Sequence, residues 1–431
     1  MKRITETFPV SDTNLCKEQM LSWCNQFNIC SLLDNHHYFS THQNIECLAA
    51  AGSIQTLPPG ASLQDLDQMI ELHKDWLFGH IGYDIKETPK NTPYEIADSL
   101  GFPDLFFFRP QTVLSLTTTE LTISTIGNDP RVIYQEIKHQ TPIAQPLLGQ
   151  IKQTPTIQSR LTKEEYLDII QKIQQHIQRG DCYELNYCQE FYVRNASIHP
   201  FTLYQQLTSL SPNPFSAFYK LTDKYVLCAS PERYLQKKGN RLISQPIKGT
   251  AKRDLSDAFA DEQLKKQLQI SEKEKSENVM VVDLVRNDLS KVCEEGSVQV
   301  DELFGVYSFP QVHQMISTIS GNVKPGIRFS DIIDASFPMG SMTGAPKKRV
   351  MELIRQYEKT KRGIYSGALG YIRPDMDFDF NVVIRSILYN ASNQYLSYLV
   401  GGGITFYSDA EKEYEECLLK AKAIHQVLRN S

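Results

Sequence analysis

Two pairs of glutamates in the C-terminal half of the sequence could bind a divalent cation. Glu274 and Glu277 lie three residues apart in a helix-forming segment, so both face one side of a helix. Glu413 and Glu416 repeat this spacing in a second such segment. Carboxylate oxygens are the ligands that Mg²⁺ prefers in proteins. Either pair alone could equally be part of a charged helix surface, so the hypothesis requires that both pairs meet in the fold.

A lysine in the segment QPIKGTAKR, residues 245–253, could act as a nucleophile. The sequence predicts that Lys248 occupies a tight turn between a strand and a charged helix. A lysine beside a glycine is, taken alone, most often a solvated surface residue. Its amine becomes a good nucleophile where a nearby cation or desolvation lowers its pKa. The surrounding residues must therefore decide whether Lys248 is chemical or merely exposed.

Five further residues could hold an anion or move a proton. Arg385 interrupts an apolar strand, and its partner could be a protein acid or an anionic substrate. Gly402 and Gly403, in the segment GGGIT, allow backbone N–H groups to approach a carboxylate or phosphate, although a flexible turn is the simpler interpretation. Glu232 and His313 lie beside strand ends, and a lone histidine in a strand is more often structural.

The glycine-rich segments do not match nucleotide-binding motifs. GGGIT lacks the G-x-G-x-x-G spacing, and GSMTGAPK (340–347) lacks the residue order of a P-loop. The sequence also shows no Ser-His-Asp order and no glutaminase-type cysteine elbow. If the protein uses ammonia from glutamine, another chain must release it.

The composition is typical of a water-soluble globular protein. Of 431 residues, 41% are hydrophobic and 22% charged, and the net charge of −5 gives no reason to expect nucleic acid or an anionic membrane as partner. The sequence shows no signal peptide and no apolar run long enough to span a bilayer. Nine cysteines without a CxxC pair indicate free thiols. We therefore expect a cytoplasmic protein.

The elements that must position these residues are mostly strands joined by short turns. Such a pattern favours an antiparallel α+β architecture over regular βαβ winding. The chain length suggests two regions, with the Pro- and Gln-rich segment 142–160 as a linker. Capping boxes are expected at Thr162/Glu165 and at Ser408/Glu411. Strands are predicted at 75–85, 103–116, 121–126, 182–193, 215–221, 224–230, 311–323, 366–372, 380–390 and 395–405, and helices at 161–180, 256–290, 346–358 and 409–428.

Taken together, eight sequence blocks resemble the chorismate-utilising enzymes, which include anthranilate, aminodeoxychorismate, isochorismate and salicylate synthases. The resemblance is dense over residues 160–428 and looser over 1–145, where DWLFGHIGYD carries it. It implies two large antiparallel sheets packed together with outer helices, an N-terminal region like that of anthranilate synthase component I at 1–145, and a chorismate-binding catalytic domain at 160–428. The blocks are GDCYELNYCQEF, SPERY, QPIKGT, SENVMVVDLVRNDLSKV, FPMGSMTGAPKKRVMELI, GIYSGALGY, NVVIRSI and GGGIT.

The resemblance also implies a role for each candidate residue. Mg²⁺ would bridge the ring carboxylate of chorismate to Glu277 and Glu416, with Glu274 and Glu413 close by. The enolpyruvyl carboxylate would be held by Tyr365, by Arg385 and by the backbone of the glycine pair, and the ring carboxylate would be contacted at the lysine turn. The implied chorismate-binding residues are Gly249, Thr250, Thr343, Tyr365, Arg385, Gly402 and Gly403.

Position 248 separates two amination chemistries within the resemblance. Aminodeoxychorismate synthases carry lysine there, and this chain resembles them most closely, whereas anthranilate synthases usually carry alanine. The resemblance thus implies amination of chorismate at C4 to 4-amino-4-deoxychorismate, for p-aminobenzoate and folate, through a covalent adduct of Lys248. Glu232 would protonate the departing hydroxyl, and His313 matches a residue that assists pyruvate loss in anthranilate synthases. Ammonia would come from a separate glutamine amidotransferase subunit.

Two alternatives remain at this point. The chain could be an anthranilate synthase component I of tryptophan biosynthesis, or a non-catalytic homologue that binds tryptophan in its N-terminal region. One residue departs from the pattern: many relatives carry glutamine at the position of Glu184, and isochorismate synthases carry a lysine that activates water. Glu184 argues against that route of water addition and leaves open whether it orients ammonia.

Overall fold

One connected antiparallel sheet forms the frame of the molecule. The computed structural model describes residues 2–38, 45–86, 98–141, 156–309 and 312–430. The sheet divides into two arms at the long strand β5 (Leu105–Leu116). The first residues of β5 pair with β4 (Leu77–Ile81), and its later residues pair with β3 (Cys47–Thr56) on one side and β6 (Glu120–Thr125) on the other.

The first arm continues from β3 into strands of residues 158–404. Its last member is β8 (Glu184–Val193), which also pairs with the short strands β7 (Gln158–Ser159) and β16 (Gly344–Ala345). Strand β1 (Ile4–Pro9) pairs with β6 beside β5. The order along this arm after β3 is β2 (Ile29–Asp34), β9 (Phe215–Leu221), β10 (Lys224–Ser230), β19 (Ser386–Asn390), β20 (Tyr395–Ile404) and β8 (Glu184–Val193), with β7 (Gln158–Ser159) and β16 (Gly344–Ala345) on β8.

The second arm starts from β4 and ends at a strand that pairs with three others, β15. In both arms, strands of residues 1–145 pair directly with strands of residues 160–428, at β2–β9 and at β4–β17. The predicted boundaries at 145 and 160 stay predictions, since residues 142–155 of the linker lie outside the described ranges. The order after β4 is β17 (Ala368–Ile372), β18 (Phe378–Val382), β11 (Arg233–Lys238), β12 (Arg241–Gln245) and β15 (Val312–Asn322), with β13 (Ile247–Lys252) and β14 (Gln299–Ser308) also on β15.

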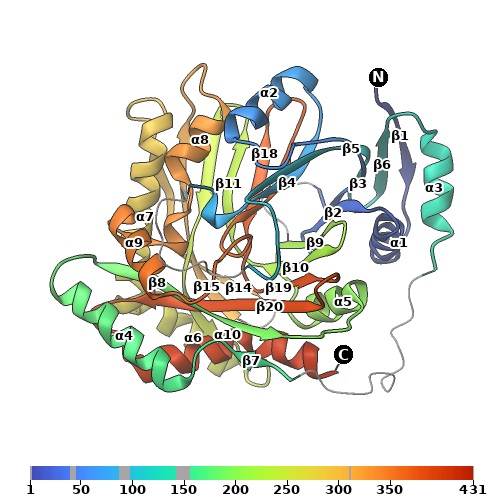
Figure 1. The fold of residues 1–431 in the computed structure, drawn as a ribbon. Coiled ribbons are helices and arrows are strands. Elements are labelled where there is room, and N and C mark those ends of the chain that lie inside the picture. The colour runs from blue at the N-terminus through green and yellow to red at the C-terminus, as the bar shows by residue number, and fades with distance from the viewer. Residues whose placement is uncertain (1, 39–44, 87–97, 142–155, 310–311, 431) are drawn as a thin grey trace.

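The two arms pack face to face, and helices cover their outer faces (Figure 1). Apolar side chains of both arms share one core, as Ala217 and Leu399 of the first arm and Phe78 and Leu369 of the second illustrate. This arrangement confirms the expected fold of two packed antiparallel layers with outer helices. The helices on the first arm are α1 (Thr13–Asn25), α3 (Pro130–Lys138), α4 (Lys163–Gln178), α5 (Pro200–Leu210), α9 (Lys347–Tyr357) and α10 (Ala410–Asn430), and those on the second are α2 (Leu63–His73), α7 (Glu272–Val292) and α8 (Phe329–Ser336).

Two helix boundaries differ from the sequence predictions. The single helix expected at 256–290 is two helices, α6 (Ala258–Ile270) and α7, because the Ser271 side chain accepts the Glu274 N–H and caps α7. The capping box at Thr162/Glu165 is confirmed, but the one at Ser408/Glu411 is wrong. Asp409 accepts the Lys412 N–H at 3.0 Å instead, and Ser408 donates to a carboxylate further along the helix.

Two further properties of the structure concern its thiols and its helices. All nine cysteines are buried free thiols. Among the described residues, none of the helices is both long and apolar enough to cross a bilayer.

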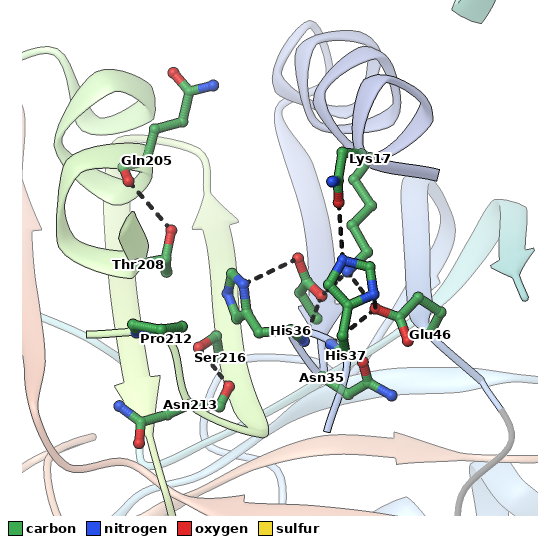
Figure 2. Close-up of polar contacts among 12 residues, drawn as sticks. Lys17, Asn35, His36, His37, Glu46, Gln205, Thr208, Pro212, Asn213 and Ser216 are labelled. Carbon is green, nitrogen blue, oxygen red and sulfur yellow. Dashed lines mark hydrogen bonds and ion pairs between the residues drawn. The ribbon is translucent and has the colours of Figure 1, made fainter. Parts of the chain in front are cut away.

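A buried ionic cluster fastens α1 to the sheet (Figure 2). The Lys17 ammonium, on α1, donates to Asp34 at 2.7 Å and to Glu46 at 2.5 Å. Burial by itself would lower the pKa of Lys17, but Asp34 and Glu46 outweigh it and raise that pKa. The backbone N–H groups of His36 and His37 donate to the same two carboxylates at 2.8 and 2.9 Å. The cluster therefore locks the start of the β2–β3 connection against α1.

Replacing the lysine is expected to destabilise the fold strongly. In Lys17→Met, two buried carboxylates lose their cation, and a broken buried pair typically costs about 3–5 kcal/mol of unfolding free energy. Urea denaturation followed by circular dichroism measures this loss. The triple change Lys17→Met, Asp34→Asn and Glu46→Gln also removes the charges of the two carboxylates and is expected to recover most of the stability. If Lys17→Met alone were as stable as the wild type, the stabilising role of this cluster would be contradicted.

Candidate active site

Lys248 lies in a bulged strand, and the tight turn predicted for it is wrong. Strand β13 pairs with β15, and the register shifts between Ile247 and Thr250. Gly249 supplies the left-handed backbone of the bulge, with a φ of +93°. A Cβ atom at Gly249 would lie 2.9 Å from a carboxylate oxygen of Glu274. Bulges redirect side chains beside active sites, and this one turns Lys248 into the protein interior.

The Lys248 ammonium pairs with a carboxylate from a different strand. Its Nζ atom donates to Oε1 of Glu184, the first residue of β8, at 2.5 Å. The two side chains are only 10% and 2% exposed, respectively. Strand β20 presents Gly403 to this pair, and a Cβ atom there would lie 2.4 Å from Glu184 Oε1 and 2.8 Å from Lys248 Nζ. Gly403, which the sequence predicted to approach an anion, therefore has no side chain that would occupy the space of this ion pair.

The protein groups around Lys248 favour its charged form. Burial by itself would lower the pKa of Lys248, but the carboxylates of Glu184 and Glu277 outweigh burial and raise it, with a smaller effect from Glu232. The lowered pKa that a nucleophilic lysine requires is therefore not provided by these residues. Lys248 is therefore held as an ammonium, which would have to lose a proton before it could act as a nucleophile.

Glu232 is a buried acid held by a serine. Its Oε1 atom accepts a hydrogen bond from the Ser341 hydroxyl at 2.6 Å, and its side chain lies in a buried environment. Burial raises the pKa of Glu232 to about 7, although Ser341 and Lys248 oppose the shift. A carboxyl group with this pKa carries a proton in a large fraction of molecules near neutrality, as a general acid must.

Arg385 does not lie inside a strand as predicted. The apolar segment 380–390 divides into β18 and β19, and Arg385 lies between them with a φ of +51°. Its guanidinium is buried enough that its pKa is lowered, with Glu232 opposing the shift. Within the described ranges, no hydrogen bond or ion pair engages this guanidinium. Of the two partners left open by the sequence, an external anion is therefore favoured over a protein acid.

Tyr365 lies in the segment next to Arg385. The backbone N–H of Ser366 donates to the Val383 carbonyl at 2.9 Å, which joins the two segments. The Tyr365 side chain is buried, and its hydroxyl accepts from the Cys188 thiol at 3.9 Å.

The structure brings the two glutamate pairs together. Lys273, at the start of α7, lies 3.9 Å from Glu277 on its own helix and 3.9 Å from Glu413 on α10. Glu416 pairs with Lys420 at 2.7 Å. A Cβ atom at Gly402 would lie 3.3 Å from Glu413 Oε2 and 4.0 Å from Glu416 Oε1. The four carboxylates therefore share one region beside the end of β20, in which Glu413 is buried and Glu416, whose side chain is 47% exposed, lies at the rim.

Three of these carboxylates lack sufficient compensation for their desolvation. Desolvation raises the pKa of Glu274 and Glu413, and it raises the pKa of Glu277 to about 7. Lys420 lowers the pKa of Glu416. Oε1 of Glu277 is buried without a hydrogen-bond partner in the described part of the chain.

The donor set fits a hard divalent cation in ligand type. In the residues that the structure describes, no three acidic, histidine or cysteine side chains already converge tightly enough to hold a metal. One Glu277 oxygen has no hydrogen-bond partner, and three of the glutamates have a raised pKa. Both observations indicate an unfavourable electrostatic environment, which a bound cation would relieve. Lys273 and Lys420 partly neutralise the cluster as it stands.

Three other predicted residues lie nearby with different surroundings. Both ring nitrogens of buried His313 are engaged, Nδ1 with Ser308 Oγ at 2.9 Å and Nε2 with Asp261 Oδ1 at 3.0 Å. Thr343 is fully buried, and its hydroxyl donates to the Met339 carbonyl at 3.1 Å. Thr250, by contrast, is exposed on β13. His313 and Thr343 are thus held by the protein itself.

Sequence reasoning missed the residues that complete the charge arrangement. Ser341 carries no signal apart from its place in the GSMTGAPK block. Lys273 and Lys420 do carry a signal, because each lies four residues from a glutamate on the same helix, Glu277 and Glu416 respectively. Glu184 departs from the residue that many relatives carry, but its contact with Lys248 depends on pairing between distant strands.

Comparison with known proteins gives a consistent result. The aminodeoxychorismate synthase component 1 of Salmonella typhimurium is 34% identical over 353 residues, which cover 82% of this chain and 76% of that protein. A probable chloroplastic aminodeoxychorismate synthase of Oryza sativa is 42% identical over 270 residues. That match covers 62% of this chain and only 30% of the rice protein, so the chain spans under a third of that relative.

Solved structures show the same fold. The menaquinone-specific isochorismate synthase MenF of Escherichia coli superposes with a TM-score of 0.78 and 18% identity, covering 99% of this chain and 94% of that chain. Anthranilate synthase component I of Streptococcus pneumoniae gives a TM-score of 0.71 and 23% identity, covering 99% and 92%. The family model described as chorismate binding enzyme matches residues 32–426. The chain therefore belongs to the family of chorismate binding enzymes.

Proposed function

We propose that this chain aminates chorismate at C4 and forms 4-amino-4-deoxychorismate. The observation that carries the proposal is Lys248, a buried amine that a strand bulge directs toward Glu184 and the acid Glu232. Relatives named aminodeoxychorismate synthase component 1 support it at 34% identity over most of both chains. Water addition or a purely regulatory role, by contrast, would give no function to a buried lysine at this position.

The two carboxylates of chorismate would bind at opposite ends of the site. The unengaged guanidinium of Arg385 would take the enolpyruvyl carboxylate, assisted by Tyr365 and by backbone N–H groups of Gly402 and Gly403. The ring carboxylate would lie near Gly249, beside the four glutamates. Repulsion between that carboxylate and the glutamates calls for a bridging cation.

We propose that this cation is Mg²⁺, held by Glu277 and Glu416 with Glu274 and Glu413 close by. When bound, the ion would neutralise the glutamates and attract the ring carboxylate. The support from the structure is the acidic cluster itself and the orphaned Glu277 oxygen.

The reaction would proceed by two displacements at the ring. The Lys248 amine forms a bond to C2, the ring double bonds shift from C1–C2 and C5–C6 to C1–C6 and C4–C5, and the C4–O bond breaks. Glu232 gives its proton to the departing oxygen, which leaves as water. Ammonia then bonds to C4, both double bonds shift back, and the C2–N bond breaks with its electron pair returning to Lys248. The new C4 ammonium returns one proton to Glu232.

Ammonia would be supplied by a separate glutamine amidotransferase subunit. The relatives' designation as component 1 supports a second component. The product would lead to p-aminobenzoate and folate. A cytoplasmic location is part of the proposal and is supported by nine free, buried thiols.

Replacing Lys248 tests the covalent route. Lys248→Ala is expected to lower aminodeoxychorismate formation from chorismate, Mg²⁺ and ammonia by about three orders of magnitude, since losing a catalytic nucleophile can cost up to about a millionfold. Liquid chromatography of the products measures this. Lys252→Ala, an exposed lysine on the same strand, is the matched control and should retain wild-type activity.

Two results would contradict the proposal. Anthranilate as the main product of the wild type would indicate the other amination chemistry. Undiminished aminodeoxychorismate formation by Lys248→Ala would exclude the lysine adduct.

Replacing Glu277 tests the cation site through stability. The pKa of Glu277 is raised by burial from 4.5 to about 7, so the native state binds its proton more tightly than the unfolded state. The free energy of unfolding therefore falls as pH rises from about 4.5 to 7. Glu277→Gln escapes this loss and is expected to be about 2 kcal/mol more stable than the wild type at pH 8 without divalent cations. Thermal denaturation across this pH range measures the difference.

Adding Mg²⁺ should reverse that order. A ligand that binds only the native state raises the unfolding temperature, so Mg²⁺ should stabilise the wild type and leave Glu277→Gln unchanged. Glu272 is an exposed glutamate at the start of the same helix, so Glu272→Gln is the control and should respond to Mg²⁺ like the wild type. A wild type whose unfolding temperature ignores Mg²⁺ would refute the site.

A further inference from the structure

Glu184 has one oxygen engaged and one oxygen free. Oε1 accepts the hydrogen bond from Lys248 Nζ at 2.5 Å. Oε2 is buried and has no hydrogen-bond partner within the described residues. The side chain is 2% exposed, so water does not compensate this carboxylate. A buried carboxylate oxygen without a donor leaves acceptor capacity unused, at a cost in free energy.

The backbone on both sides fixes the position of Glu184. Strand β16 pairs with the start of β8, with Ala345 opposite Glu184, and the Tyr183 N–H donates to the Ala345 carbonyl at 2.8 Å. Gly344 lies so close that a Cβ atom there would be 2.1 Å from the Glu184 carbonyl oxygen. The close approach of Gly403 limits the side chain from β20. The carboxylate therefore has a defined place against the lysine.

The other two acids near Lys248, Glu232 and Glu277, have roles of their own in the proposed function. Glu232 accepts from Ser341 and must carry a proton of its own for the departing hydroxyl. Glu277 lies beside Lys273 at 3.9 Å. Within the described ranges, the hydrogen bond that Lys248 Nζ donates goes to Glu184.

We propose that Glu184 is the base that takes the proton from Lys248 before the lysine attacks chorismate and returns it when the lysine leaves. This inference rests on the proposed function. The proton moves from Nζ to Oε1, which converts the ammonium–carboxylate pair into an amine and a carboxylic acid. The neutral amine then forms the bond to C2. After the C2–N bond breaks, the acid returns the proton to the amine, so the pair ends as it began.

The carboxylate is essential to this role, since an amide in its place would accept the same hydrogen bond but could not take the proton. In Glu184→Gln the lysine must release its proton to solvent, so its reactivity should rise with pH. In the wild type the proton stays within the pair, so the rate should be flat across neutral pH.

Adduct formation without ammonia isolates the step. Wild type and Glu184→Gln are mixed with chorismate and Mg²⁺, quenched, and examined by intact mass spectrometry for a gain of chorismate less one water. The rate for Glu184→Gln near neutrality is expected to fall by about a hundredfold, the lower end of what a positioned base contributes. That rate should rise with pH, whereas the wild-type rate should not.

Controls separate a base from a structural residue. Glu190 is a second buried carboxylate on β8 and accepts a hydrogen bond from Arg160. Glu190→Gln should leave the pH dependence unchanged. Glu184→Asp keeps a base at shorter reach and should react more slowly with the flat wild-type profile. Circular dichroism establishes that each variant folds.

The outcomes distinguish the two proposals. No adduct in the wild type would refute the covalent function itself. An adduct that forms in Glu184→Gln at the wild-type rate, with the wild-type pH profile, would overturn the role of Glu184 alone. If Glu184→Gln does not fold, a Glu184→Asp rate that rises with pH would overturn it instead.

Discussion

The charge of one buried ammonium constrains the whole candidate site. Lys248 is surrounded by carboxylates that raise its pKa, and those carboxylates are themselves destabilised by burial. Removing any charge would change the protonation of the others, because charges in a low-dielectric interior interact strongly. The glycines of the site follow from this crowding. Gly249 and Gly403 lie where a Cβ atom would meet a carboxylate oxygen at 2.9 and 2.4 Å, so only the smallest residue leaves room for the charges.

The antiparallel sheet explains how residues so distant in sequence meet. Glu184 begins β8, and β8 pairs with β20, which carries the glycines; Lys248 lies on β13 at the end of the other arm. The site therefore forms where the two arms approach each other at the ends of strands. Helices α7 and α10 contribute their first two turns, which places four glutamates near the lysine and the positive helix ends close to them.

Local features could be predicted from the sequence, and features set by a partner strand could not. The cap at Thr162 was predicted correctly because the pattern is self-contained. The cap at Ser408 failed because the adjacent Asp409 offers a competing acceptor. Apolar residues on both sides of Arg385 look like one strand, since nothing in their type reveals a positive φ. The bulge at Lys248 depends on its register with β15, so composition suggested a turn. The family resemblance indicated the candidate residues, but the pairing of Glu184 with Lys248 depends on how distant strands are arranged in the fold.

Two buried lysines of this chain show why a charge cluster alone does not identify a reactive group. Lys17 and Lys248 are both buried beside acids that raise their pKa. Around Lys17, Asp34 and Glu46 each accept a backbone N–H bond as well as the lysine, and neither keeps a buried oxygen without a hydrogen-bond partner among the described residues. Around Lys248, Glu184 and Glu277 each keep a buried oxygen without a hydrogen-bond partner among the described residues. A fold gains nothing from leaving such oxygens unpaired, because each costs about 1–3 kcal/mol. In the proposed function these oxygens accept a proton or a cation during turnover, whereas no such role is needed around Lys17.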